Sequence, residues 1–380
     1  MKLVSVETRM YAVGFGDCFL LSFHYSGKRS RHVLIDFGTT AYPSSREHEI
    51  LRPVAEDIAR RTSGKLTAVV ATHRHRDHIG GFAPHPRATA PGAIIAALKP
   101  SLVVQPWTEN PLLGDDARHP APIPRAAVRA GFREEWMAMA RNNLPNRPAI
   151  RHLEGLGGES RYVYAGQRSG LEDLLPGIRV DVLGPLSPRQ AGRSKPARFW
   201  DREFAAAGPL TPLFPGFPAM RRWPLETRWL LNRIRDWHSD RILELTRAYD
   251  SDINNTSVVL AIRALGHTMI FPGDAETESW TGMLARRGTL DILRRATLLK
   301  ASHHGSANGT PNVLWEALPR EGLRVLLSTQ GGVYGHNVPC ANLLKRMRSE
   351  ACLIDSRDYP RGSSVAVEFV AGRPPRKLPS

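Results

Sequence analysis

Three histidines and one aspartate stand within six positions of one short segment, directly after an apolar stretch: His73, His75, Asp77 and His78. Packing does not explain such a cluster, because a metal ion stabilises neutral imidazoles and a carboxylate held close together, whereas crowded imidazoles on a surface hold nothing in place. Residues two apart on a tight loop can converge on one ion, and the Asp-His pair that follows, at a helix start, can face a second. The segment therefore predicts a dinuclear metal site.

Strands and helices alternate on both sides of a less regular middle, and this alternation indicates packed sheets with outer helices. The elements expected in the first part are strands at 2–10, 17–25, 31–36 and 66–72 and a helix at 45–61. Those expected after residue 253 are strands at 257–262, 268–272 and 297–302 and a helix at 276–287. The similar order predicts two structurally related halves of one α/β domain.

Two Pro- and Arg-rich stretches, at about 83–151 and 185–251, are predicted to be irregular insertions in a single domain that covers 1–370. Apolar residues at helical spacing over 230–249 predict a helix packed on the core at the end of the second insertion. The tail at 371–380 is rich in Pro and Arg and is expected to be flexible.

The H-x-H-x-D-H pattern at 73–78 resembles that of the metallo-β-lactamase superfamily, and three further segments stand in the order of that family's motifs: Val33–Gly38, Phe271–Asp274 and Ser302–Ser306. A closer resemblance is to the lactamase-like domains of the ComEC competence-protein type, through Gly14–Asp17, Asn254–Ser257 and the double histidine. The resemblance implies an αββα sandwich, in which two mixed β-sheets are flanked by helices.

The resemblance also implies two divalent ions, zinc or manganese. In the family's pattern Asp36 would orient a metal ligand without binding the metal itself, and Asp274 would bridge the two ions. The metal ligands expected from it are His73, His75, Asp77, His78, Asp274, His303 and His304. The superfamily's separate middle histidine has no clear match, and we expect His119 and His152 at the surface. Both His303 and His304 are therefore expected at the metals, and one that is not a ligand would be placed as a proton donor.

Catalytic roles are predicted for Asp77, His304 and His336, of which His336 lies in a Gly-rich loop after an expected strand at 325–328. Carboxylate bridging makes a hard, oxygen-rich centre suited to phosphoryl oxygens. We therefore expect a phosphodiesterase or nuclease that uses a metal-activated water. The alternatives are a small-molecule ester or lactone hydrolase of the same fold and a binding module without turnover, which the complete ligand set disfavours.

The formal net charge is +16, from 52 Lys and Arg against 36 Asp and Glu. Clustered cations favour nucleic acid or another phosphodiester as partner, although an arginine-rich composition of genomic origin would give the same charge. One dense cationic run is a candidate substrate guide, with a solvated loop as the competing interpretation: Arg189, Arg193, Lys195, Arg198 and Arg202.

The sequence predicts a cytoplasmic protein that has no membrane partner. No run reaches the roughly 18 apolar residues that a membrane helix needs, and no signal peptide is evident. The 3 cysteines include no C-x-x-C pair, which fits a reducing compartment. The oligomeric state is not predicted.

Overall fold

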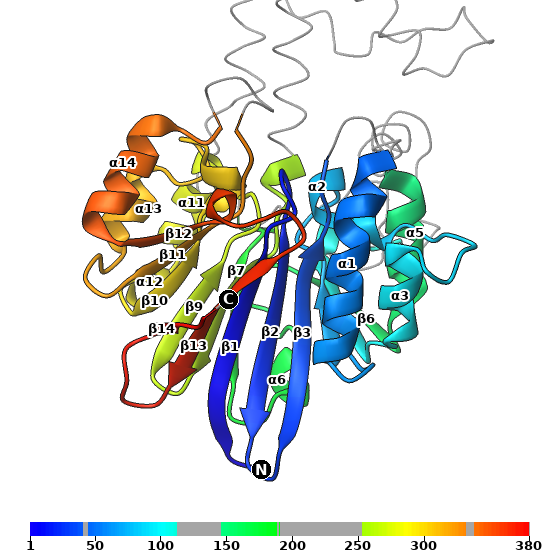
Figure 1. Cartoon of the computed structure of the whole chain (residues 1–380). Helices are drawn as coiled ribbons and strands as arrows, with labels where there is room; N and C mark the ends of the chain where they lie inside the picture. The colour runs from blue at the N-terminus through cyan, green and yellow to red at the C-terminus, as the bar shows by residue number, and fades with distance from the viewer. Residues whose placement is uncertain (41–44, 112–145, 188–189, 191–252, 332–337, 380) are drawn as a thin grey trace, which may run out of the picture.

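Two β-sheets packed face to face form the centre of the molecule (Figure 1). The computed structural model describes residues 1–40, 45–111, 146–187, 190, 253–331 and 338–379. Within these residues the first sheet has the strand order β14-β13-β1-β2-β3-β4-β5-β6, and the second has the order β12-β11-β10-β9-β8-β7. Both sheets are mixed, because antiparallel strands continue into parallel ones. The two halves of the chain are thus built alike.

The strands have the following bounds. Those of the first sheet are β1 Leu3–Tyr11, β2 Cys18–Tyr25, β3 Arg29–Phe37, β4 Ala68–Val70, β5 Leu102–Pro106, β6 Glu159–Val163, β13 Ser364–Val370 and β14 Arg376–Lys377. Those of the second are β7 Arg179–Gly184, β8 Val259–Ala264, β9 His267–Phe271, β10 Ala296–Lys300, β11 Arg324–Leu327 and β12 Cys352–Asp355.

Helices cover the outer face of each sheet, on the right and on the left in Figure 1. Those on the first sheet are α1 Ser45–Arg61, α3 Pro91–Ala97 and α5 Arg147–Leu156, and those on the second are α11 Thr277–Leu284, α12 Thr289–Leu293, α13 Asn312–Ala317 and α14 Ala341–Glu350. The shorter helical turns are α2 Arg76–Ile79, α6 Leu171–Leu174, η1 Gly80–Phe82, η2 Trp107–Glu109, η5 Ser302–Gly305 and η6 Ser356–Asp358. This helix–sheet–sheet–helix order confirms the predicted αββα sandwich.

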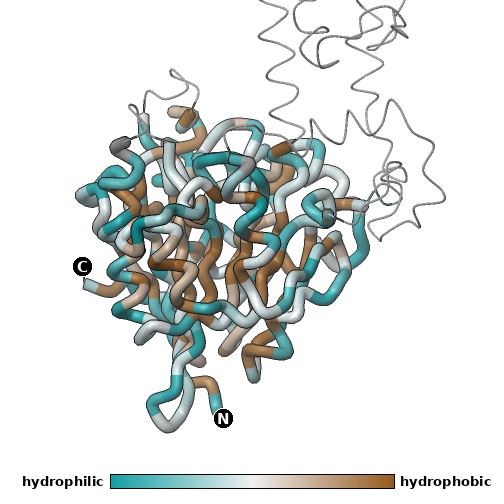
Figure 2. Tube along the Cα trace, turned by 90° about the vertical axis from the view of Figure 1, so that its right-hand side faces the viewer, coloured by the Kyte–Doolittle hydropathy of each residue, from teal (hydrophilic) through white to brown (hydrophobic). Residues whose placement is uncertain are grey.

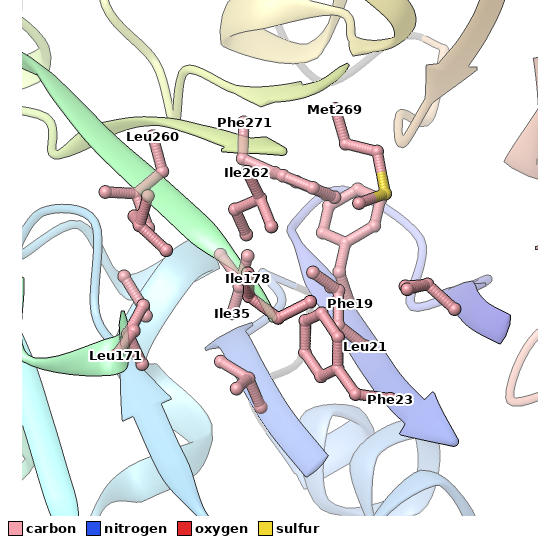
Figure 3. Close-up of a cluster of buried hydrophobic side chains, with 14 of the residues drawn as sticks. Phe19, Leu21, Phe23, Ile35, Leu171, Ile178, Leu260, Ile262, Met269 and Phe271 are labelled. Carbon is pink, nitrogen blue, oxygen red and sulfur yellow. The ribbon is translucent and has the colours of Figure 1, made fainter. Parts of the chain in front are cut away.

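Apolar side chains alternate along the inner strands, so that each such strand serves two cores. Along β2, Phe19, Leu21 and Phe23 pack in the core between the sheets, whereas Leu20 packs in the core under α1. Phe19 meets Phe271 of the other sheet edge-on, with ring centroids 5.8 Å apart (Figure 3). Figure 2 shows the apolar segments gathered in the strands at the centre. This packing fixes the two sheets to each other and aligns their strand ends.

Regular elements lie within two stretches that the sequence analysis expects to be irregular or flexible. The stretch 83–151 contains α3, β5 and the start of α5, and β5 is fully buried inside the first sheet. A strand buried on both faces shows no polar alternation, so its short apolar run is not distinctive. The tail at 371–380 contains β14, whose Arg376 and Lys377 pair with β13. Two cationic residues carry no apolar signal of a strand.

The predicted helix over 230–249 lies outside the described residues, as does most of the predicted insertion at 185–251. Among the residues that the structure describes, no helix has the length and the apolar composition that would let it cross a membrane.

Two glycines bring the first strands directly against the backbone of α2. A Cβ on Gly38 would lie 2.6 Å from the carbonyl oxygen of Asp77, and a Cβ on Gly16 would lie 2.7 Å from the same atom. The backbone N–H of Asp17 donates a hydrogen bond to that carbonyl at 2.8 Å. The missing side chains therefore allow the close approach that fixes the start of α2.

We predict that Gly38→Ala lowers the free energy of unfolding by about 2 kcal/mol, because the added methyl would overpack against backbone that has no room to move. Chemical denaturation measures this change. Gly155→Ala is the matched control, since a Cβ on Gly155 of α5 meets nothing within 4 Å. Equal stability of the two variants would contradict the close approach.

Candidate metal centre

Four of the predicted ligands, from both halves of the chain, meet where strands end. Asp77 and His78 lie in α2 after β4, Asp274 follows β9, and His304 lies in η5 after β10. Asp274 Oδ2 lies 3.1 Å from His78 Nε2 and 3.2 Å from His304 Nε2, and the latter lies 2.9 Å from Asp77 Oδ2. One ligand atom of each residue lies within 4.8 Å of the others, and all four residues are buried. This set could hold a metal ion.

Asp36 orients the ring of His78, which is the supporting role that the family resemblance implies for it. Its Oδ2 lies 2.8 Å from Nδ1 of His78, which leaves Nε2 facing Asp274. Asp36 has a left-handed φ of 55° and is held there by Thr72. The backbone N–H of Thr72 donates to Oδ1 at 2.8 Å, and its hydroxyl donates to Oδ2 at 2.7 Å. A carboxylate that accepts the second ring N–H is the usual support of a metal-binding histidine.

The two adjacent histidines of η5 point to different partners. Nδ1 of His304 lies 3.0 Å from the carbonyl oxygen of Ser328, and its ring packs against Phe15. His303 Nδ1 lies 3.1 Å from Glu276 Oε1, and His303 Nε2 lies 3.4 Å from the amide nitrogen of Asn254. The sequence predicts both as ligands, but His303 is not part of the group of four.

The four side chains share protons with one another. Burial disfavours charge on His304, yet the carboxylates of Asp274 and Asp77 raise the pKa of His304 to about 10. Burial also disfavours charge on Asp274, but His304, His78 and Lys300 hold the pKa of that carboxyl well below its usual range. A divalent cation would displace such shared protons. Nε2 of His78 is buried and makes no well-aligned hydrogen bond, although Asp274 Oδ2 lies 3.1 Å away, and such an atom is suited to bind a metal. The residues therefore fit a metal ion.

His73 and His75 lie beside this group without belonging to it. His73 Nε2 lies 3.0 Å from His75 Nδ1, and the rings of His73 and His78 are 4.1 Å apart at their centroids. Burial, with the neighbouring histidines, lowers the pKa of His73 well below its usual value, so its imidazole is neutral at neutral pH. Neutral imidazole is the form that binds metal.

A buried lysine that the sequence analysis did not identify binds the Oδ1 oxygen of Asp274, the one that does not face the histidines. Lys300, 1% exposed at the end of β10, donates to Asp274 Oδ1 at 3.0 Å and to the carbonyl oxygen of Gly273 at 2.8 Å. It also pairs with the buried carboxylate of Asp17. Burial alone would lower the pKa of Lys300, but Asp17 and Asp274 raise it above its usual value. Lys300 is therefore a permanent cation that leaves Oδ2 of Asp274 free to face the histidines.

A buried ion pair fixes the loop that carries His73 and His75. Arg74, between them, donates to both carboxylate oxygens of Glu109 at 2.8 Å, and both side chains are buried. The side-chain amide of Asn146 donates to the carbonyl oxygen of Arg74 at 2.6 Å. Glu109 follows β5, which the sequence analysis placed in an insertion. No sequence pattern therefore indicated the ion pair between Arg74 and Glu109.

Several predicted residues lie outside the described part of the chain: His119, His336, Arg189, Arg193, Lys195, Arg198 and Arg202. Their roles stay predictions. His152, predicted at the surface, is half-buried in α5 and its Nδ1 lies 2.6 Å from the carbonyl oxygen of Phe82.

Residues 12–163 match the family model of the Metallo-beta-lactamase superfamily. The fold is that of a metallo-β-lactamase domain. No curated protein matches the chain. The matched range includes Asp36 and the segment 73–78 but ends before Asp274, Lys300 and His304, so these three are placed by geometry alone. Fold and ligand cluster together fit a metal-dependent hydrolase. The ComEC-type assignment stays a prediction.

We predict that His304→Ala weakens metal binding by at least about a hundredfold, because it removes a nitrogen from the ligand group. His303→Ala, its neighbour, is the matched control and should keep the wild-type metal content. Mass-spectrometric metal analysis of the two purified variants, with circular dichroism to establish folding, makes the comparison. Loss of metal from the His303 variant alone would reverse the assignment.

We also predict that Lys300→Met lowers the free energy of unfolding by about 3 kcal/mol, since two buried carboxylates would lose their shared cation. Adding Asp17→Asn to that variant removes one of these charges and should restore part of the loss. Urea denaturation of the three proteins after chelator treatment measures both effects. If Lys300→Met were as stable as the wild type, the lysine would not hold the site together.

Proposed function

We propose that this protein is a dinuclear metal-dependent phosphodiesterase or nuclease, with a nucleic acid or nucleotide as substrate. The observation that carries the proposal is the ligand set around Asp274, which contains only imidazole nitrogens and carboxylate oxygens. Such donors suit hard divalent ions, zinc or manganese, and a carboxylate between two sites suits phosphoryl oxygens. Two ions held there would neutralise charge on a phosphoryl group and activate a water as nucleophile.

The ligands divide into two sets that share Asp274. Asp77, His78 and His304 would hold one ion, and His73 and His75 would hold the other. The rings of His73 and His78 are in contact, which supports two ions close enough to act on one substrate. Asp36, Ser328 and Lys300 keep the ligands in their orientations and do not take part in bond making.

His303 is suited to protonate the leaving oxygen. It remains 16% exposed, whereas the side chain of His304 is inaccessible. Burial disfavours its charged form, but Glu276 and Asp274 raise the pKa of His303 above its usual value. Nδ1 faces Glu276, and we propose Nε2, which has only a long contact of 3.4 Å with the amide nitrogen of Asn254, as the atom that gives the proton. A histidine protonated near neutral pH is an effective general acid.

An exposed arginine near Gly14 and Gln330, without a carboxylate partner among the described residues, supports an anionic substrate. Arg361 is exposed, and no carboxylate within the described residues lies within 4.0 Å of its guanidinium. A Cβ on Gly14 would lie 3.9 Å from Arg361 Nε and 3.0 Å from Gln330 Oε1. Gln330 stands two residues after Ser328, the residue that holds His304. Together with the formal net charge of +16, this placement favours a phosphate over a neutral ester.

Hydrolysis of bis-p-nitrophenyl phosphate and of oligonucleotides, compared with a lactone and a carboxylic ester under added manganese or zinc, tests the proposal. We expect turnover of the phosphodiesters and a loss of at least about a thousandfold in Asp274→Ala, because the shared ligand of both ions is gone. Turnover of the lactone or ester alone would favour the small-molecule hydrolase instead.

The same assay separates the roles of the two histidines. His303→Gln should slow cleavage of an oligonucleotide, whose alkoxide leaving group needs a proton, far more than cleavage of the nitrophenyl diester, whose leaving group does not. An equal loss on both substrates would exclude His303 as the proton donor.

A further inference from the structure

Two adjoining cavities run along β7, the outermost strand of the second sheet within the described residues. One, of about 420 Å³, lies between β7, the loop at 166–168 and the turn at 286–289. The other, of about 500 Å³, lies between residues 177–179, the turn at 263–268 and Arg295. Ile178 and Arg179 line both cavities, which therefore adjoin, and we call the two together the groove.

Arginine side chains dominate this groove. Those lining it are Arg168, Arg179, Arg263, Arg286, Arg287 and Arg295, against two carboxylates, Glu172 and Asp181. Both carboxylates are already engaged, Glu172 by Arg168 and Asp181 by Arg263. Three of the arginines, at 286, 287 and 295, have no carboxylate within 4.0 Å in the described part of the chain. The groove thus has unbalanced positive charge.

The guanidinium of Arg286 is held over the backbone instead of extending into solvent. Its Nη2 donates to the carbonyl oxygen of Ala165 at 3.5 Å, and a Cβ on Gly166 would lie 2.9 Å from that nitrogen. The backbone N–H of Gly166 donates to the carbonyl oxygen of Val182 in β7 at 2.8 Å. A guanidinium presents its N–H groups in a planar fork that suits phosphate.

Strand β7, which lines the groove, runs toward the end of the sheet that carries the candidate metal centre. At the end of β7, Gly184 pairs with Val259 of β8. The next residue back, Val258, donates its backbone N–H to the carbonyl oxygen of Thr72 at 2.9 Å, directly before His73. A strand of six residues spans about 20 Å, which matches several phosphate repeats of a nucleic-acid chain.

We propose that this groove binds the phosphodiester backbone of a nucleic acid and guides it toward the metal centre. The proposal rests on the proposed function for its biological meaning, but binding in the groove is measured without catalysis. Contacts to phosphate carry no sequence preference and depend strongly on salt. The groove should therefore bind nucleic acids of any sequence.

The test is fluorescence anisotropy of a labelled single-stranded oligonucleotide, in the presence of chelator, across a potassium chloride series. The full chain is compared with the triple variant Arg286→Gln, Arg287→Gln and Arg295→Gln. Loss of three phosphate contacts should lower the slope of log affinity against log salt by about two units and weaken binding at least about tenfold at low salt. The matching lysine variant, which keeps the charges, should retain most of the slope.

The charge-matched control replaces three exposed arginines outside the groove, Arg29, Arg87 and Arg373, with glutamine. It removes the same charge and should leave the slope nearly unchanged. Equal losses of affinity and slope in the two triple variants would contradict binding in the groove. An unchanged slope in the groove variant would contradict it as well. Hydrolysis of bis-p-nitrophenyl phosphate by the unaltered chain tests the proposed function separately, so that either idea can fail alone.

Discussion

The buried carboxylate of Asp274 joins the two halves of the molecule at the candidate metal centre. Its Oδ2 faces His78 from the first half and His304 from the second, while Lys300 holds Oδ1. Buried carboxylates are strongly destabilising unless cations lie beside them. The packing of one sheet on the other and the assembly of the ligands therefore depend on each other, since neither half contains the whole group.

The negative charge of Asp274 and its neighbouring carboxylates is balanced by one lysine and by protons on two histidines. Lys300 stays charged because Asp17 and Asp274 raise its pKa, and it can offset only part of the negative charge. The remaining charge is balanced by protons on His78 and His304, whose pKa values lie above the ordinary value for histidine. A divalent cation would replace these protons and give Nε2 of His78 a ligand bond in place of its poorly aligned contact with Asp274. The electrostatics thus favour metal binding independently of the family match.

Much of the fold and of the ligand group could be predicted from the sequence, because strand periodicity and ligand spacing are local signals. Asp77 and His78 belong to a local cluster whose spacing predicts a metal site, whereas Asp36 and Asp274 are expected only from the resemblance to the metallo-β-lactamase superfamily. Lys300 could not be predicted, since a lysine that ends an apolar strand is ordinarily a solvated one. The choice between His303 and His304 depends on two successive left-handed residues, which no spacing reveals.

The most direct measurement of the central claim is anomalous X-ray diffraction from crystals grown with manganese or zinc. We predict a peak about 2.0–2.3 Å from ligand atoms of Asp77, His78, Asp274 and His304, and a second peak bound by His73 and His75 that shares Asp274. A metal bound elsewhere, with Asp274 still paired only to Lys300 and the histidines, would contradict the account.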